Sequence, residues 1–137
     1  MKAIILAGGR GKRLRPITDK IPKPLIPINN KPLIERTIKY LKKYGINEII
    51  ISSGYKSNLI EKFLKKKKNF GCKIIFSIEK TPLGTGGAIK KALKHVNEKS
   101  FLVLNGDIVT NIDLKKILKK PNTIAANELK TKFGTMN

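Results

Sequence analysis

Four short apolar runs alternate along this chain with segments of helical periodicity, and this alternation limits the fold more than any other feature. The runs are strand-length, and the first is apolar at every position, as in strands buried on both faces. They are Ala3–Leu6, Glu48–Ser52, Lys73–Ile78 and Phe101–Leu104, and a fifth strand is expected to start at Thr123–Ala126. Strands separated by helices favour right-handed crossovers and a mostly parallel sheet. We therefore expect an α/β fold.

The segments between these runs have apolar residues at helical spacing. Asn58 is expected to cap one helix, with Glu61 three residues later completing a capping box. The other expected helices run from Pro32 to Gly45, from Thr85 to about His95, and through a short segment capped by Asp113.

Composition sets limits on partners and compartment. The 137 residues suit one domain, and 30 Lys+Arg against 9 Asp+Glu give a net charge of +21. A polyanionic partner fits this charge, but the lysines are spread along the chain and the few aromatic residues do not interleave with them, which does not favour nucleic acid. No apolar run reaches the roughly 18 residues of a membrane span. The single cysteine, Cys72, excludes a disulfide framework and favours a reducing cytoplasm.

The first expected strand ends in the sequence LAGGRGKRLRP, residues 6–16. Three glycines in positions 8–11 allow backbone N–H groups to approach phosphate oxygens, and four cations in positions 10–15 can neutralise a polyphosphate. A Walker loop is excluded by spacing, and the dinucleotide fingerprint is excluded because it requires glycine where Leu14 stands. The segment predicts a phosphate-binding loop, with an ordinary turn as the alternative.

A proline-flanked lysine follows this loop. Pro22 and Pro24 are expected to fix an extended path around Lys23, and a lysine held in this way suits a developing phosphate charge. The alternative is a proline-rich loop with a solvated lysine.

Two further motifs follow later strands. In Glu79–Ala88, glycines open a helix and let a flat group approach the backbone, although tight packing of a helix on the sheet would need them equally. Asp107 follows a buried strand, a common position for a Mg²⁺ ligand, although a plain Asn-Gly-Asp turn is the alternative. Because ligands gather at the carboxyl ends of parallel strands, we expect all these loops to face one crevice.

Taken together, the four motifs resemble those of the sugar-1-phosphate nucleotidyltransferases, also called NDP-sugar pyrophosphorylases. The resemblance covers essentially all of residues 2–137, and the stretch 76–88 looks most like mannose-1-phosphate and D-glycero-D-manno-heptose-1-phosphate guanylyltransferases. It implies a three-layer αβα, Rossmann-like nucleotidyltransferase fold, truncated after about the fifth strand. Residues 1–137 would then be the N-terminal nucleotide-binding part, with the sugar-binding part absent.

The resemblance also implies a reaction, in which NMP, here GMP, passes from an NTP to a sugar 1-phosphate with release of pyrophosphate. Arg13 on the leaving group and Lys23 at the α-phosphate would be the catalytic residues, and Asp107 would hold Mg²⁺. Glu79 would face the Watson–Crick edge of the base, and Gly84 would contact the base through its backbone. The nucleotide-binding residues implied by the motifs are Leu6, Ala7, Gly8, Gly9, Gly11, Lys12, Arg13, Glu79, Gly84 and Thr85.

Three functions stay open at this point. In the family, a second metal carboxylate and a lysine on the sugar phosphate lie beyond the position of residue 137. The alternatives to an enzyme are therefore an inactive nucleotide-binding remnant or half of a split enzyme, and thirdly a basic nucleic-acid-binding domain. A homo-oligomer or a complementing C-terminal fragment is the expected protein partner.

Overall fold

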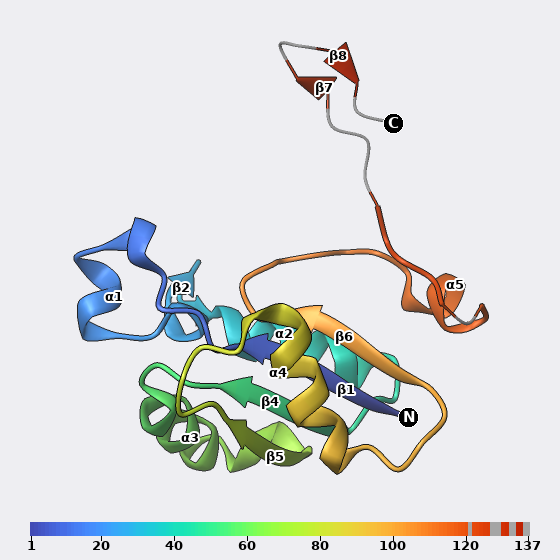
Figure 1. Cartoon of the computed structure of the whole chain (residues 1–137), viewed down its shortest axis with the longest axis horizontal. Helices are drawn as coiled ribbons and strands as arrows, with labels where there is room; N and C mark the ends of the chain where they lie inside the picture. Colours follow the sequence, from blue (N-terminus) through green and yellow to red (C-terminus); the bar gives the residue numbers. More distant parts are fainter. Residues whose placement is uncertain (121, 127–129, 132–133, 136–137) are drawn as a thin grey trace.

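A four-stranded parallel sheet forms the centre of the protein (Figure 1). The computed structural model describes residues 1–120, 122–126, 130–131 and 134–135. The strands lie in the order β5-β4-β1-β6, so the N-terminal strand is internal. Their bounds are β1 Lys2–Ala7, β4 Glu48–Ser53, β5 Lys73–Ile78 and β6 Phe101–Asn105. The four apolar runs are thus confirmed as strands, with bounds that differ from the expected ones by one residue or none.

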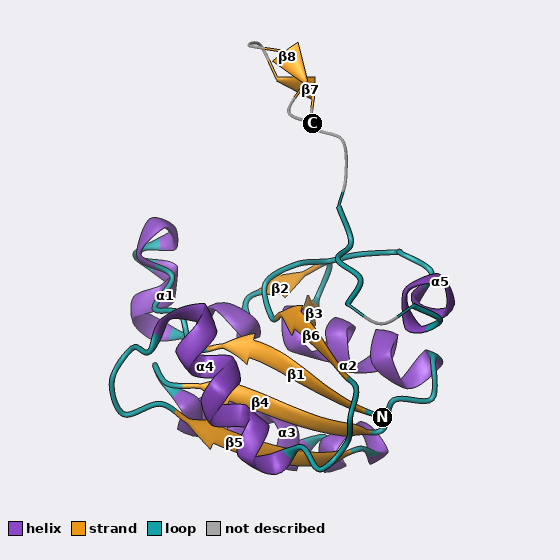
Figure 2. Ribbon diagram, turned by 45° about the vertical axis from the view of Figure 1, so that its right-hand side comes forward, coloured by secondary structure: helices purple, strands orange, loops and turns teal. Residues whose placement is uncertain are grey.

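Helices cover both faces of this sheet, which confirms the three-layer αβα arrangement (Figures 1 and 2). On one face, α2 (Leu33–Lys43), α3 (Ser57–Lys66) and α5 (Leu114–Leu118) contribute to a core with Ile5 and Ile51 of the sheet. On the other face, α4 (Gly84–Ala92) packs through Ala92 on Ile4 and Ile50. The alternation along β1 and β4 therefore sends neighbouring isoleucines into opposite layers.

Several short elements fill the connections. They are η1 (Lys12–Leu14), α1 (Ile17–Lys20), η2 (Lys23–Leu25), β2 (Pro27–Ile28), β3 (Lys31–Pro32), η3 (Lys68–Gly71), η4 (Leu93–His95), β7 (Lys130–Thr131) and β8 (Gly134–Thr135). Strands β2 and β3 pair antiparallel, as do β7 and β8. The expected helix from Thr85 to about His95 is confirmed, its end being the 3₁₀ turn η4.

The extended path predicted around Lys23 is wrong, because Lys23 begins the 3₁₀ turn η2. Pro22 alone keeps extended dihedral angles, with φ −69° and ψ 149°. The Ile26 N–H donates to the Lys23 carbonyl at 3.0 Å, and this bond closes the turn. The two prolines hold Lys23 in a turn and not in an extended strand.

The fifth strand predicted at Thr123–Ala126 is also wrong. Residues 123–126 have no strand pairing, their side chains are exposed, and Ile124 is 89% exposed. The Thr123 hydroxyl donates to the Lys120 carbonyl at 2.8 Å, which ties the segment back to the preceding turn. Within the described residues the main sheet therefore ends at β6, its fourth strand, and not after a fifth.

The capping box predicted at Asn58 does not form. Helix α3 begins at Ser57, after Lys56 in the left-handed conformation with φ 51°. Glu61 instead pairs with Lys65 one turn further along the helix, at 2.8 Å. The cap predicted for α5 is confirmed, since the Asp113 carboxylate accepts from the Lys115 N–H at 3.1 Å. No helix in the described part of the chain is both long and apolar enough to cross a membrane.

Candidate functional site

The four parallel strands end at one edge of the sheet, and the loops that follow them pack closely there. The Gly106 N–H after β6 donates to the Leu6 carbonyl of β1 at 2.8 Å. A Cβ atom added to Gly54, after β4, would lie 3.2 Å from the Glu79 carbonyl, after β5. It would also lie 3.7 Å from the Gly8 carbonyl, after β1. The expected convergence of the four loops is thus confirmed.

A cavity of about 260 Å³ opens at this edge, between β1, β6 and the start of α4. Its lining includes Pro82, Ala88 and Asn105, which are not among the expected nucleotide-binding residues. The nucleotide-binding residues from the sequence analysis that line it are Leu6, Gly8, Gly9, Glu79, Gly84 and Thr85. Ala7 does not line it, because this side chain belongs to the core on the opposite face of the sheet. Gly11, Lys12 and Arg13 also lie outside its lining.

The carboxylate of Glu79 is held in place at the wall of this cavity. Its Oε1 accepts from the Ser52 hydroxyl at 3.0 Å, and its Oε2 accepts from the Leu83 N–H at 3.2 Å. A Cβ atom on Gly8 would lie 2.8 Å from Glu79 Oε1, closer than real Cβ contacts. The absence of a side chain at Gly8 therefore leaves the room that the Glu79 carboxylate occupies.

Tyr55, in the segment after β4, holds the glycine-rich loop of residues 8–11 in place. Gly11 has φ +64°, and its carbonyl accepts from the buried Thr18 hydroxyl at 2.9 Å. The Tyr55 hydroxyl donates to the Thr18 carbonyl at 3.0 Å, and the Arg10 guanidinium lies over the Tyr55 ring at 5.4 Å. The loop is thereby attached to the sheet through Tyr55.

Lys12 and Arg13 lie in the turn η1, with exposed side chains. Neither donates a hydrogen bond or forms an ion pair in the described part of the chain. Two adjacent cations next to a glycine loop can meet an incoming polyphosphate without first breaking an internal pair.

The predicted phosphate lysine and the predicted metal carboxylate come together. Lys23 Nζ lies 2.5 Å from Asp107 Oδ2, across 84 positions of sequence. Both side chains are partly exposed, so the pair is open to a ligand. The motifs predict a phosphate partner for Lys23 and a metal partner for Asp107, and they give no indication that the two side chains pair.

The chemistry of this donor set suits a magnesium ion only in part. No group of three or more His, Cys, Asp or Glu side chains that could hold a metal ion is found where the chain is described. Mg²⁺ is commonly bound by one or two carboxylates together with substrate phosphates and water. Asp107 fits the role of the single protein carboxylate, provided that nucleotide phosphates supply further oxygens.

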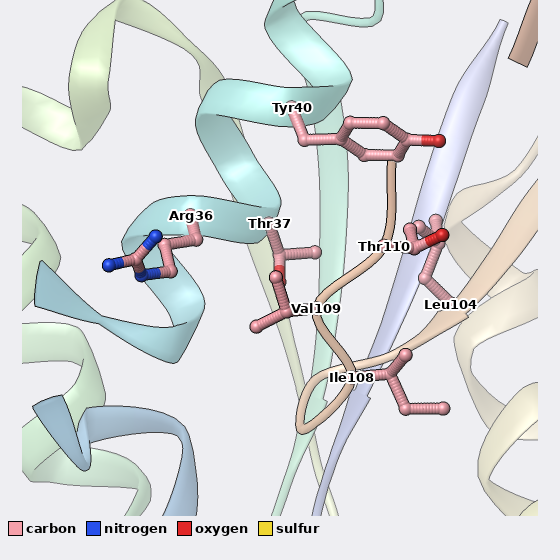
Figure 3. Close-up of a pocket in the computed structure, with 7 residues that line it drawn as sticks. All are labelled: Arg36, Thr37, Tyr40, Leu104, Ile108, Val109 and Thr110. Atoms are coloured by element: carbon pink, nitrogen blue, oxygen red, sulfur yellow. The ribbon is translucent and has the colours of Figure 1, made fainter. Parts of the chain in front are cut away.

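A second, much smaller cavity lies between α2 and the loop after β6 (Figure 3). Its volume of about 30 Å³ is far too small for a nucleotide. The Tyr40 hydroxyl donates to the Ile112 carbonyl at 2.5 Å and fastens this loop to α2. Burial raises the pKa of Tyr40, with smaller contributions from Tyr44 and Asp113. The cavity is lined by Arg36, Thr37, Tyr40, Leu104, Ile108, Val109 and Thr110.

Comparison with known proteins agrees with this geometry. A family model described as nucleotidyl transferase matches residues 2–136. The chain belongs to the nucleotidyl transferase family. The chain is 47% identical over 141 residues to the D-glycero-alpha-D-manno-heptose 1-phosphate guanylyltransferase of Campylobacter jejuni, covering 100% of this chain and 63% of that protein. It is 46% identical to the enzyme of the same name from Aneurinibacillus thermoaerophilus, covering 88% of this chain and 52% of that protein.

Solved structures confirm the fold of this chain. The crystal structure of HddC from Yersinia pseudotuberculosis complexed with GMP-PN superposes with a TM-score of 0.79 at 42% identity. The match covers 86% of this chain and 52% of HddC. The expected Rossmann-like nucleotidyltransferase fold is therefore confirmed, while the chain spans between half and two thirds of these relatives.

Two residues of the site were missed by sequence reasoning. Ser52 stands at the end of an isoleucine-rich strand, and a polar side chain at that point is a signal that could have pointed to it. Tyr55 gave no such signal, because its contact with Thr18 joins positions 37 residues apart.

Proposed function

We propose that this nucleotidyl transferase binds GTP in the cavity beside Gly8 and Gly9 and serves the transfer of GMP to a sugar 1-phosphate. The observation that carries the proposal is the Glu79 carboxylate, held by Ser52 and Leu83 at the cavity wall. The relatives that are guanylyltransferases by name support the choice of nucleotide and acceptor.

The chemistry of Glu79 favours guanine over pyrimidine bases. Guanine offers two adjacent donors, the N1–H and the exocyclic amine, which a carboxylate accepts as a bidentate pair. Uracil and thymine would set a carbonyl oxygen against the carboxylate, leaving that carbonyl unpaired. An amide at this position could both donate and accept, so Glu79→Gln should weaken the discrimination.

The phosphates would extend from this cavity toward the glycine-rich loop. Backbone N–H groups of residues 8–11 and the exposed side chains of Lys12 and Arg13 would meet the β- and γ-phosphates, with Arg13 on the leaving group. Lys23 would stabilise charge at the α-phosphate, once released from Asp107. Mg²⁺, held by Asp107 and the phosphates, would neutralise the pyrophosphate as it leaves.

In the proposed step, an oxygen of the sugar 1-phosphate attacks the α-phosphorus in line. The bond between the α-phosphorus and its bridging oxygen to the β-phosphate breaks, and pyrophosphate takes both electrons of that bond. No residue of the chain forms a covalent intermediate, so the protein contributes positioning and charge stabilisation.

Titration of GTP, UTP, dTTP and ATP in the presence of Mg²⁺ tests the nucleotide assignment. Loss of a charge-assisted pair costs about ten- to a hundredfold in affinity, so GTP should bind more tightly than UTP and dTTP by that factor. Glu79→Gln should narrow this gap. Tighter binding of UTP or dTTP than of GTP would show the guanine assignment to be wrong.

A second measurement separates an enzyme from a nucleotide-binding part. The chain spans 52% of one heptose-1-phosphate guanylyltransferase and 63% of the other, so nucleotide binding and GMP transfer are measured separately. Pyrophosphate release with GTP and either mannose 1-phosphate or manno-heptose 1-phosphate would establish the transfer itself. GTP binding without release would establish the nucleotide-binding part alone.

We place the protein in the cytoplasm, where the lone Cys72, a buried free thiol, would stay reduced. A homo-oligomer or a complementing C-terminal fragment remains our prediction for its protein partner.

A further inference from the structure

The Ser52 hydroxyl donates a hydrogen bond to the Glu79 carboxylate at the wall of the cavity. Ser52 is fully buried near the end of β4, and its Oγ donates to Glu79 Oε1 at 3.0 Å. The partner oxygen belongs to a carboxylate that lines the nucleotide cavity, whereas Ser52 itself does not line it. Ser52 therefore reaches the cavity only through Glu79.

Two hydrogen bonds hold the Glu79 carboxylate, one on each of its oxygens. Leu83 donates from the backbone to Oε2 at 3.2 Å, and among the described residues Ser52 supplies the only side-chain donor to Oε1. Each carboxylate oxygen has two lone pairs, so Oε1 can accept from Ser52 and still face a base. Without the Ser52 hydroxyl, only the hydrogen bond from the Leu83 N–H would hold the carboxylate, which could then rotate away from Gly8.

The neighbouring strand contains a natural control for this contact. Ser77 of β5 is the register partner of Ser52 and is 2% exposed. Its Oγ is buried without a hydrogen-bond partner within the described structure. The two serines therefore match in residue type, burial and register position, and they differ in the hydrogen bond to Glu79.

We propose that Ser52 is a positioning residue that sets base preference by fixing the direction of the Glu79 carboxylate. The proposal rests on the proposed function, because it takes the cavity beside Gly8 as the place where the base binds. It assigns discrimination between nucleotides to the Ser52–Glu79 pair, so that Glu79 needs its buried neighbour to discriminate.

The test compares four versions of the chain by equilibrium titration with GTP and with UTP in the presence of Mg²⁺. Ser52→Ala should shrink the ratio of the two dissociation constants by roughly three- to tenfold, the usual effect of losing one ordinary hydrogen bond, because the Leu83 N–H still holds the other oxygen of the carboxylate. Ser77→Ala, the matched control, should leave the ratio unchanged. Ser52→Thr, which keeps the hydroxyl, should retain most of it.

A double-mutant cycle shows whether Ser52 acts through Glu79. In a Glu79→Ala background, adding Ser52→Ala should leave the GTP-to-UTP ratio where Glu79→Ala alone puts it. An equal further loss in that background would show a general structural effect and would overturn the positioning role. Retained UTP affinity in Ser52→Ala shows that the variant has kept a folded site.

The remaining outcomes separate this proposal from the nucleotide assignment. If the parent chain prefers GTP and Ser52→Ala shows the same GTP-to-UTP ratio, the role of Ser52 is overturned and the guanine assignment stands. A parent chain that prefers UTP, with that preference lost in Ser52→Ala, overturns the guanine assignment and supports the role of Ser52. A parent chain that binds both nucleotides equally overturns both.

Discussion

The ammonium group of Lys23 lies 2.5 Å from Asp107 Oδ2, so the residue proposed for the α-phosphate and the residue proposed for the metal bind each other. Nucleotide and metal must therefore separate this pair before either side chain takes its proposed part. In the proposed site the Lys23 ammonium and a metal ion would compete for one carboxylate oxygen of Asp107, and a phosphate group would compensate Lys23 when the metal replaced it.

Removing the competing ammonium should strengthen metal binding to the nucleotide-free chain. We expect Lys23→Gln to raise affinity for Mn²⁺, used as a paramagnetic probe for Mg²⁺, while GTP affinity falls because a phosphate contact is lost. The measurement is paramagnetic broadening of the Gly106 amide signal, next to Asp107, during a Mn²⁺ titration. Identical broadening in the parent chain and Lys23→Gln would contradict the competition.

Asp107→Asn should abolish the tightening of GTP binding by Mg²⁺ while leaving the fold intact. Without metal, the same variant should bind GTP at least as tightly as the parent, because Lys23 is then free and a negative charge near the phosphates is gone. Calorimetric titrations with Mg²⁺ and with a chelator measure both effects, and thermal unfolding checks the fold. A variant that still binds more tightly with Mg²⁺ would remove Asp107 from the metal site.

Gly8→Ala should alter base preference more than phosphate affinity. The added methyl would lie 2.8 Å from Glu79 Oε1, so the carboxylate must move from its two hydrogen bonds. We expect a reduced GTP-to-UTP ratio, while affinity for inorganic triphosphate changes little. A uniform loss of affinity for both nucleotides and for triphosphate would instead place the effect of Gly8 in the phosphate loop.

A pair of glycine substitutions tests how tightly the loop after β6 crosses β1. Gly106→Ala would bring a methyl to 2.9 Å from the Leu6 carbonyl, a backbone atom that cannot rotate away, and should cost about 1–3 kcal/mol of stability. Gly86→Ala, within α4 and with no atom within 4 Å of the added methyl, should stabilise by about 0.5–1 kcal/mol. Urea denaturation gives both values, and equal effects would argue against the close crossing.

The thiol of Cys72 should ionise less readily in the folded chain than after unfolding. Burial raises its pKa, and Lys42 offsets this only in part. At pH 8 alkylation by iodoacetamide should therefore be slower for the folded chain than in urea. Because the folded pKa is the higher one, this group favours folding fully below its unfolded value of about 8.5 and loses that contribution as pH rises through the folded value. Cys72→Ala should lack this part of the pH dependence, and equally fast alkylation of both states would contradict the shift.

The sheet was predictable because the strand sequences are apolar enough to show that the strands are buried. Isoleucines in unbroken runs at positions 4–5 and 49–51 have to be covered on both faces, and helices on both faces follow from that need. Thr123–Ala126 has strand-forming residues as well, yet strand preference depends on a neighbouring strand, and the described structure gives this segment none. Asn58 likewise does not cap α3 as predicted, because the chain turns earlier, at Lys56, where the Ser57 N–H donates to the Gly54 carbonyl.

The candidate site was predictable as a list of residues but not as a set of contacts. Glu79, Gly84 and Thr85 follow from the motifs and do line one cavity. The bonds from Ser52 to Glu79 and from Lys23 to Asp107 join positions 27 and 84 residues apart, so no local spacing encodes them. The motif also gives Ala7 as a nucleotide-binding residue, and strand alternation directs the side chain of Ala7 into the core on the opposite face of the sheet.

The internal position of β1 has a consequence for the order in which the chain can fold. Strand β1 pairs with β4 on one side and with β6 on the other, and β6 ends at Asn105. An emerging chain of fewer than about a hundred residues therefore holds β1 with one edge open, and long-range parallel pairing of this kind is slow. Since the Gly106 N–H closes onto Leu6 only after β6 has docked, the cavity wall that joins Leu6 to Asn105 forms only once synthesis has passed this strand.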